Sequence, residues 1–428
     1  MAKKNQSDND RSKCGEKSIS AAPLLAAVSY MTDIIPGGCL FHSWRIALAA
    51  EHIAASVFPD EAAEVFYAGL MQEVGCVGAA RHVTAYCSLA DQLDDHIIKT
   101  HPRRGGALLE WLPGMSESAK MVRYHHEWWN GSGYQDGLSG TDIPQTSQLL
   151  LLVETLDTIG CFRSWQGMAA GLRRLACCTK QAWNKQIWTS VVQSLEDAEF
   201  YTRLMSQEAL HGLISDCLTR HPVPSELDNE AGVERIFHIF AALVDAKDPT
   251  TVGHSRRTAI FARLLAEHMG LSEQEIQLAY RAGLVHDCGR LGLPASLLRR
   301  SGRLSPEEME QVRQHAQMTN RVMNCMPDCS GMLEIGRVAG YDHERYDGTG
   351  YPDRLTGENI PLISRILSVV DAFDAMTSAA TYKNLLSPRF AVIRLQQAAG
   401  TQFDPNVVDA MASAVESKLF QVAPSEAA

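Results

Sequence analysis

The stretch of sequence that decides the fold reads Ser272-Glu-Gln-Glu-Ile-Gln-Leu-Ala-Tyr-Arg-Ala-Gly-Leu-Val-His-Asp-Cys-Gly-Arg290. Ser272 and Glu275 have the spacing of a capping box, so we expect a helix to begin there. An apolar-rich run follows and leads into the adjacent pair His286 and Asp287. This pair is therefore expected near the buried end of a core helix, where an unpaired carboxylate is costly unless a cation or another partner compensates its charge.

Helical patterns also dominate the rest of the chain. Ile260, Phe261, Leu264 and Leu265 mark one apolar face, and Ser305-Pro-Glu-Glu308 is typical of a helix start with Pro at the first helical position. Alternating strand-like runs flanked by hairpin turns are scarce. We therefore predict an all-α protein.

Further candidate metal ligands occur on both sides of the His-Asp pair. An adjacent His and Asp supply a nitrogen ligand and a carboxylate that can bridge two cations. Taken singly, each additional candidate has an ordinary alternative as a packed imidazole, a helix cap or a turn residue. Taken together they indicate a site for more than one metal ion, and they are His254, His315, Asp342, His343 and Asp371.

Residues from about 233 to 415 carry a longer series of motifs in a fixed order. The series consists of Ala246-Lys-Asp-Pro249, His254-Ser255, His286-Asp-Cys-Gly-Arg-Leu-Gly-Leu-Pro294, His343-Glu-Arg-Tyr-Asp-Gly-Thr-Gly-Tyr-Pro352, Gly357-Glu-Asn-Ile-Pro361, Asp371-Ala-Phe-Asp-Ala-Met-Thr377 and Ala399-Gly-Thr-Gln-Phe-Asp-Pro405. In this order the second half resembles the HD-GYP family, the branch of the HD metal-dependent phosphohydrolases that hydrolyses cyclic dinucleotides, chiefly cyclic di-GMP.

The resemblance implies two metal ions, with iron or manganese as the family's usual metal. One ion would take His254, His286, Asp287 and Asp371, and the other would share Asp287 and take His315, Asp342 and His343. Some members hold a third ion through a Glu at the place where this chain has Thr250, so we expect two divalent ions. The implied reaction opens the cyclic dinucleotide to linear pGpG, with onward cleavage to GMP left open.

Substrate contacts are implied by the same resemblance. Tyr351 is expected to approach the ligand, and Tyr382 and Lys383 remain from a segment in which the family's Arg has become Ala380. Loss of that Arg weakens phosphate binding, because only Arg offers a bidentate fork.

Two positions near the predicted metals also depart from the family. Arg290 stands where the family has a Lys that contacts phosphate or helps protonate the leaving group, and we assign it to catalysis with Asp287 and to substrate binding. Arg keeps the charge but is a poor proton donor. Asp342 replaces a His, an oxygen ligand in place of a nitrogen one, which can retune the metal preference without abolishing the site.

The first half repeats the second at offsets of 212 to 217 residues. Gln72 and Glu73 replace the His-Asp pair, which removes one nitrogen ligand. The predicted degenerate site consists of His42, Glu73, His101, His125, His126 and Glu154. One cation could still bind there, but the two-metal arrangement is lost. Two roles stay open for this half, a scaffold that packs against its sister and a sensory unit that binds metal or nucleotide without cleaving it.

These patterns predict two tandem HD-domain-like helical bundles in 428 residues, of which 45% are hydrophobic. We expect a disordered N-terminus over residues 1–20, a degenerate HD-GYP-like domain over 21–200 and an HD-GYP phosphohydrolase domain over 233–420. Residues 201–232 between them are expected to form one connecting helix and a Pro-containing linker.

Composition narrows the function classes. A formal net charge of −11 argues against general nucleic-acid binding. No stretch approaches the ~20 apolar residues of a membrane span, and the polar N-terminus lacks the hydrophobic part of a secretory signal. The eleven Cys show no disulfide or zinc-finger spacing. We therefore expect a cytoplasmic protein; its oligomeric state stays open.

Three function hypotheses follow. The first is a cyclic di-GMP phosphodiesterase, favoured by the intact ligand set. The second is a module that binds cyclic di-GMP, or docks a partner such as a diguanylate cyclase, with little turnover; Arg290, Asp342 and Ala380 favour it. The third is an HD phosphohydrolase for another nucleotide, which the Gly348-Thr-Gly-Tyr-Pro352 loop disfavours. Sequence does not distinguish cyclic di-GMP from cyclic GMP-AMP.

Overall fold

The computed structural model describes residues 19–79, 81–86, 89–300, 302–326, 329–378 and 385–420, apart from the side chains of 89–91 and 177–182. Within these ranges the chain is helical, and its one β-type pairing is an isolated bridge between Ala399 and Phe403. The all-α prediction is confirmed. The expected disordered tail lies outside the described residues, except for its last two positions.

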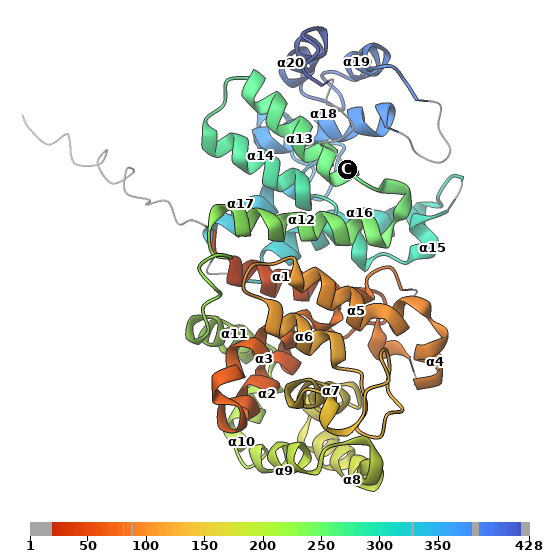
Figure 1. Cartoon of the computed structure of the whole chain (residues 1–428). Coiled ribbons are helices and arrows are strands. Elements are labelled where there is room, and N and C mark those ends of the chain that lie inside the picture. The colour runs from red at the N-terminus through yellow and green to blue at the C-terminus, as the bar shows by residue number, and fades with distance from the viewer. Residues whose placement is uncertain are drawn as a thin grey trace, which may run out of the picture.

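The first half of the chain forms the lower part of the molecule in Figure 1. Its helices are α1 (Ala21–Asp33), α2 (His42–Val57), α3 (Ala62–Met71), α4 (Leu89–Asp94), α5 (His96–Glu110), α6 (Ser116–Tyr124), α7 (Gln145–Thr158), α8 (Trp165–Ala182), α9 (Lys185–Ser194), α10 (Ala198–Leu204) and α11 (Gln207–Arg220).

The second half lies above it in the same view. Its helices are α12 (Glu230–Lys247), α13 (His254–His268), α14 (Glu273–Val285), α15 (Ala295–Leu298), α16 (Pro306–Met323), α17 (Ser330–Ala339), α18 (Leu362–Thr377), α19 (Pro388–Gln397) and α20 (Pro405–Glu416).

The two halves use the same packing scheme. Helix α2 packs on α3 as α13 packs on α14, and both of the shorter members lead into a 3-10 turn, η2 (Gln72–Cys76) and η7 (Cys288–Gly292). Helix α5 packs on η2 and α6, as α16 packs on η7 and α17. Each half is thus a helical bundle of the same kind, as the repeated sequence motifs predict.

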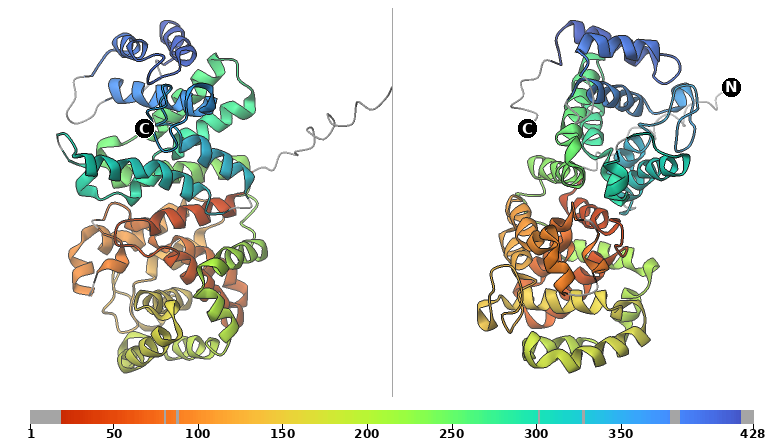
Figure 2. Two further views of the ribbon diagram at one scale, coloured as in Figure 1. Left: turned by 180° about the vertical axis from the view of Figure 1, so that it is seen from behind. Right: turned by 90° about the vertical axis from the view of Figure 1, so that its right-hand side faces the viewer.

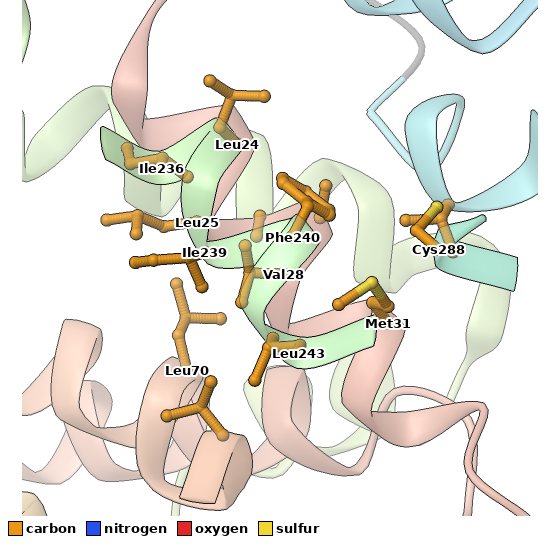
Figure 3. Close-up of a cluster of buried hydrophobic side chains, with 14 of the residues drawn as sticks. Leu24, Leu25, Val28, Met31, Leu70, Ile236, Ile239, Phe240, Leu243 and Cys288 are labelled. Atoms are coloured by element: carbon orange, nitrogen blue, oxygen red, sulfur yellow. The ribbon is translucent and has the colours of Figure 1, made fainter. Parts of the chain in front are cut away.

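The halves meet along their first helices, with α1 beside α12 in both views of Figure 2. Figure 3 shows the apolar side chains at this contact, where Leu24 and Val28 of α1 face Ile239 and Phe240 of α12. All four side chains are at most 1% exposed, so the contact is as fully shielded from solvent as the interior of either half. Helix α1 also packs against η7 and α16 of the second half.

The segment between the halves differs from the single connecting helix that we expected. It contains two helices, α10 and α11, and both pack on α2 of the first half. At the end of α11, Arg220 donates to the carboxylate of Glu51 at 2.6 Å and the ring of His221 lies 2.8 Å from it. The domain boundaries themselves stay predictions.

No helix in the described part of the chain is both long enough and apolar enough to cross a membrane.

Candidate metal centres

The His286-Asp287 pair lies at the end of α14, as the sequence predicts. The capping box of Ser272 and Glu275 is formed, and α14 ends at Val285. Residue 289 is glycine because the turn touches α16: a Cβ there would lie 2.1 Å from the carbonyl oxygen of His315. The close approach brings His315 to the pair.

One group of candidate ligands gathers beside His286. His254 Nε2 lies 3.0 Å from Asp371 Oδ1, and His286 Nε2 lies 4.0 Å from the same oxygen. Three helices supply them, because His254 begins α13, His286 follows α14 and Asp371 lies in α18. The three residues lie close enough together to hold one metal ion.

Asp287 lies between this group and a second one. Its Oδ2 is 3.8 Å from His286 Nε2, whereas its Oδ1 is 3.8 Å from His315 Nε2. His343 Nε2 lies 2.9 Å from His315 Nε2 and 3.8 Å from Asp342 Oδ2. The carboxylate of Asp287 thus presents one oxygen to each group, the arrangement that a bridging ligand needs.

The hydrogen bonds around this cluster suit cation binding. The carbonyls of Gly283 and Val312 accept from Nδ1 of His286 and His315 at 2.9 and 2.6 Å, so in the neutral imidazoles the Nε2 lone pairs are free to ligate. His286 Nε2 and both carboxylate oxygens of Asp342 are buried without a hydrogen-bond partner among the described residues. Such orphaned groups are costly unless a cation faces them.

Burial and neighbouring charges shift the ionisation of the cluster. Burial raises the pKa of Asp342 well above its usual range. Burial opposes ionisation of Asp287 too, but Arg290 and His286 hold its pKa well below the usual range. Burial likewise lowers the pKa of His254, yet hydrogen bonds to Asp371 and Asp374 outweigh it and raise the value to about 10. Without a cation, this protonated imidazole balances part of the buried negative charge.

Sequence reasoning missed the residues that orient His254. Asp374 Oδ2 accepts from His254 Nδ1 at 2.7 Å, and Arg257 holds the same carboxylate with its Nε at 2.7 Å and Nη2 at 3.0 Å. The first half repeats this trio with Asp157, His42 and Arg45. The repeat was the available signal, because Arg45 and Arg257 share the offset of the two histidines.

Arg290 occupies the place next to the predicted bridging carboxylate. Its Nη1 donates to Asp287 Oδ2 at 2.7 Å and its Nη2 to Asp248 Oδ2 at 3.2 Å. Asp248 belongs to the Ala246-Lys-Asp-Pro249 motif, to which we assigned no role. The guanidinium is therefore shared between two buried carboxylates.

The glycine-rich loop lies against the second group of ligands. The ring of Tyr351 stacks on that of His343, with 5.0 Å between the ring centroids. The guanidinium carbon of Arg313, a residue of α16, lies over the Tyr351 ring at 5.4 Å from its centroid. Gly348 has a φ of +78°, which favours glycine. A pocket of about 420 Å³ opens beside this loop and is lined by Glu310, Arg313, Gln314, Gln317, Gly348, Thr349, Gly350, Tyr351, Pro352 and Arg354.

The carboxylate of Glu344 holds the far side of this loop. Its two oxygens accept from the backbone N–H groups of Asp353 at 2.6 Å and Leu355 at 3.0 Å. Glu127 does the same in the first half, where it accepts from Asp136, Gly137 and Leu138. We assigned neither glutamate a role from the sequence.

Two predicted substrate contacts, Tyr382 and Lys383, lie outside the described residues, as does Ala380. Arg300 and Arg345 pair with Glu308 and Asp347. Arg313, which we did not consider, is the cation that faces Tyr351.

The first half brings most of its predicted residues together. The buried triads are His101, His125 and His126; Glu73, His125 and Glu154; and Glu73, Cys76 and His101. Cys76, which sequence reasoning missed, donates its thiol to Glu73 at 2.9 Å. His42 joins none of these triads; its ring lies 5.6 Å from that of His82.

Comparison with known families extends the likeness over most of the chain. A family model described as "HD domain" matches residues 26–170 and again residues 238–407. One matched segment lies in each helical bundle, and together the two segments contain the histidine clusters of both halves.

Curated relatives match one or both halves. The 3'3'-cGAMP-specific phosphodiesterase 3 of Vibrio cholerae is 28% identical over 319 residues, which cover 74% of this chain and 67% of that protein. The cyclic di-GMP phosphodiesterase response regulator RpfG of Xanthomonas campestris is 37% identical over 172 residues, which cover 40% of this chain and 45% of RpfG. The chain thus spans less than half the length of RpfG.

One solved structure resembles the whole chain. It is the crystal structure of the V. cholerae cyclic GMP-AMP specific phosphodiesterase V-cGAP3, with a TM-score of 0.67 and 21% identity. The superposition covers 96% of this chain and 99% of that one. At this identity the likeness concerns the fold, including the succession of two helical bundles.

Proposed function

We propose that the second half of this chain is a metal-dependent phosphodiesterase of cyclic dinucleotides. The proposal proceeds from the family, because the chain belongs to the HD-domain family and to its HD-GYP branch. The preferred substrate in this proposal is cyclic di-GMP and the product is linear pGpG. The observation that carries the proposal is the carboxylate of Asp287, which presents one oxygen to His286 and the other to His315.

In this proposal the donor set would hold two divalent ions of the iron or manganese type. His254, His286 and Asp371 would hold one ion and His315, Asp342 and His343 the other, with Asp287 shared. Mixed imidazole and carboxylate ligands suit these metals. When bound, such a pair of ions makes water a better nucleophile at neutral pH and stabilises charge on the phosphodiester oxygens.

Residues around the ligands would position the substrate. Arg290 keeps a positive charge beside Asp287, and its planar guanidinium can form a forked contact with a phosphate. Tyr351 and Arg313 line the pocket next to His343, where an aromatic ring and a guanidinium plane offer stacking surfaces for a base. The buried ligands keep bulk water away from the phosphodiester.

Cyclic GMP-AMP is the competing substrate. Both substrates occur in the names of relatives, cyclic di-GMP in RpfG and 3'3'-cGAMP in the V. cholerae enzyme that matches more of this chain. We retain cyclic di-GMP because RpfG, which has the higher identity of the two over its matched residues, carries that name. Reduced thiols support a cytoplasmic location as part of the same proposal, and they are those of Cys39, Cys76, Cys161, Cys217, Cys288 and Cys325.

A second candidate function is a binding module with little turnover, docking cyclic di-GMP or a diguanylate cyclase. This function is favoured by the hydrogen bonds of Arg290, whose guanidinium donates to the carboxylates of both Asp287 and Asp248. A cation that uses Asp287 must compete with this guanidinium.

The test is an assay of the purified full chain, loaded anaerobically with Mn²⁺ or Fe²⁺ and supplied with cyclic di-GMP and cyclic GMP-AMP in parallel. Chromatography should show linear dinucleotide from cyclic di-GMP at the higher rate. Asp287→Asn should lower the rate by a factor of about 10³ or more, since an essential ligand is lost. The exposed Asp409→Asn is the matched control and should act as wild type. Binding of both nucleotides without product would decide for the binding module.

A further inference from the structure

The first half contains a buried cluster that the proposed hydrolysis does not use. Its members come from four elements, since Glu73 and Cys76 lie in η2, His101 in α5, His125 and His126 after α6, and Glu154 in α7. Each is at most 5% exposed. Such a concentration of imidazole, thiol and carboxylate groups in a dry interior needs a physical reason.

Two imidazoles of the cluster face each other in a way that suits a cation between them. The carbonyls of Ile98 and Val122 accept from Nδ1 of His101 and His125, at 2.6 and 2.5 Å. In the neutral rings Nδ1 then carries the proton and Nε2 carries a lone pair. The two Nε2 atoms are 3.1 Å apart, so two lone pairs point at one another.

The carboxylates lack compensation of their own. Glu154 Oε2 and His126 Nε2 are buried without hydrogen-bond partners among the described residues. Among the described residues, the ion pairs of Glu73 and Glu154 involve only histidines of the cluster. By contrast, the buried triad of Glu51, Cys217 and His221 has Arg220 as a cation on its carboxylate, so it needs no metal.

Distances within the cluster are close to the edges of a coordination polyhedron. Ligand atoms about 2.0–2.3 Å from one ion lie about 2.9–3.7 Å from each other. Here Cys76 Sγ is 2.9 Å from Glu73 Oε2 and His126 Nε2 is 3.7 Å from Glu154 Oε1, whereas His101 Nε2 is slightly farther from Glu73 Oε2, at 3.9 Å. Cys76 and His126 belong to different triads, but the triads share Glu73, His101 and His125, so side-chain shifts would bring the six residues onto one ion.

Cys76 changes the type of metal that fits. It occupies the place of Arg290, at the same offset of 214 residues that relates Glu73 to Asp287. The second half thus has a cation where the first half has a further ligand. A thiol with three imidazoles selects a borderline ion such as zinc over manganese.

We propose that the first half holds a single zinc-type ion through Cys76, His101, His125 and His126 with Glu73 and Glu154, in a closed site that does not hydrolyse. The cluster offers more protein ligands than a four-coordinate ion needs, so it leaves no position for a substrate oxygen. On binding, the thiol proton of Cys76 leaves to solvent and the thiolate sulfur ligates the ion. The ion would tie η2, α5 and α7 together. The proposal is independent of hydrolysis in the second half.

Cobalt is the probe, because a thiolate on Co²⁺ gives a charge-transfer absorption in the near ultraviolet and the second-half ligands include no cysteine. Metal-free full chain titrated with Co²⁺ should develop this band and reach a plateau once the first-half site is filled, because Co²⁺ bound by the second-half ligands adds nothing to it. Cys76→Ser should abolish the band, and Cys217→Ser, which alters the other buried triad, should retain it. Zn²⁺ should displace the cobalt band and raise the melting temperature.

A second measurement covers the histidines. The double variant His101→Ala with His125→Ala should bind one equivalent of Zn²⁺ less than wild type by elemental analysis, with its helical circular dichroism checked. A band that survives Cys76→Ser, the lack of any band in wild type, or unchanged stoichiometry in the folded double variant would overturn the proposal.

Discussion

Asp287 and Glu73 occupy equivalent positions in the two halves, yet their neighbours give them different roles. Asp287 is held by Arg290 and lies between two groups of histidines. Glu73 accepts from the thiol of Cys76 and forms no ion pair with an arginine of the described part of the chain. Arg290 against Cys76 and His286 against Gln72 are thus among the exchanges that distinguish the proposed substrate site from the proposed closed metal site.

Asp374 allows a test of ligand orientation. Its carboxylate fixes the ring of His254, so Asp374→Asn should weaken metal binding at the second-half site by about 10–100-fold. Manganese titration followed by electron paramagnetic resonance measures this affinity. The matched control is Asp157→Asn, which alters the equivalent carboxylate of the first half and should leave the second-half affinity unchanged. Equal losses in both variants would argue for a general folding defect instead.

Lys247 predicts a pH-dependent stability. Its ammonium is buried without a hydrogen-bond partner among the described residues, and burial together with Arg299 lowers its pKa to about 8. The unfolded chain binds the proton more tightly, so wild-type stability rises between pH about 8 and about 10.5. Lys247→Met should therefore raise the free energy of unfolding by about 2 kcal/mol at pH 7, with the gain shrinking toward pH 10.5.

Denaturant unfolding at several pH values measures the effect of Lys247→Met. The exposed Lys120→Met, also in a helix, serves as control and should change stability by less than about 0.5 kcal/mol at every pH. A Lys247→Met chain that is less stable than wild type at pH 7 would contradict the assignment of an uncompensated buried charge.

At the scale of elements, the sequence predicted helix starts well and tertiary contacts poorly. The capping boxes at Ser272 and Ser305 are both formed, because they depend on residues three apart. The orienting Asp374 could not be assigned, because its partner His254 lies 120 residues away and its spacing from Asp371 also suits an ordinary helix face. Cys76 was missed because only the fold, which packs η2 against α5, brings its thiol close to Glu73 and His101.

The break between α10 and α11 shows the same limit. Ser206 caps α11 by accepting from the N–H of Ala209, and both helices pack on α2. A serine inside a helical pattern does not by itself predict the end of a helix, because serine is also tolerated within helices.

The loop that carries Tyr351 provides an element-scale prediction. Glu344 holds this loop by accepting two backbone hydrogen bonds, so Glu344→Ala should free the amides of Asp353 and Leu355 and raise the KM for the cyclic dinucleotide more than it lowers kcat. Hydrogen exchange and steady-state kinetics measure the two effects. Glu127→Ala, its first-half counterpart, should speed exchange at residues 136–138 and leave KM unchanged.

At the scale of the whole molecule, the contact between α1 and α12 joins the two bundles into one hydrophobic core. Helix α1 also packs against η7 and α16. A structural change on metal binding in the first half would therefore reach the turn next to Asp287 through these contacts. This route makes the first half a candidate regulator of the second, beyond a scaffold.

Phe240 tests how strongly the halves depend on each other. It is fully buried at the contact, so Phe240→Ala should lower the free energy of unfolding by about 3–5 kcal/mol and split thermal unfolding into two transitions. Differential scanning calorimetry detects both effects. Phe390→Ala, at a phenylalanine that is 62% exposed, should change stability by less than about 0.5 kcal/mol. A single unshifted transition in Phe240→Ala would mean that the contact contributes little.

In the proposed site Asp287 joins two cations of the second half. Anomalous X-ray diffraction from manganese-loaded crystals of the full chain would locate both ions. We expect two anomalous peaks on either side of the Asp287 carboxylate, one near His286 and one near His315. A metal-loaded crystal with no peak beside Asp287, or with one peak that touches only one of its oxygens, would contradict the account.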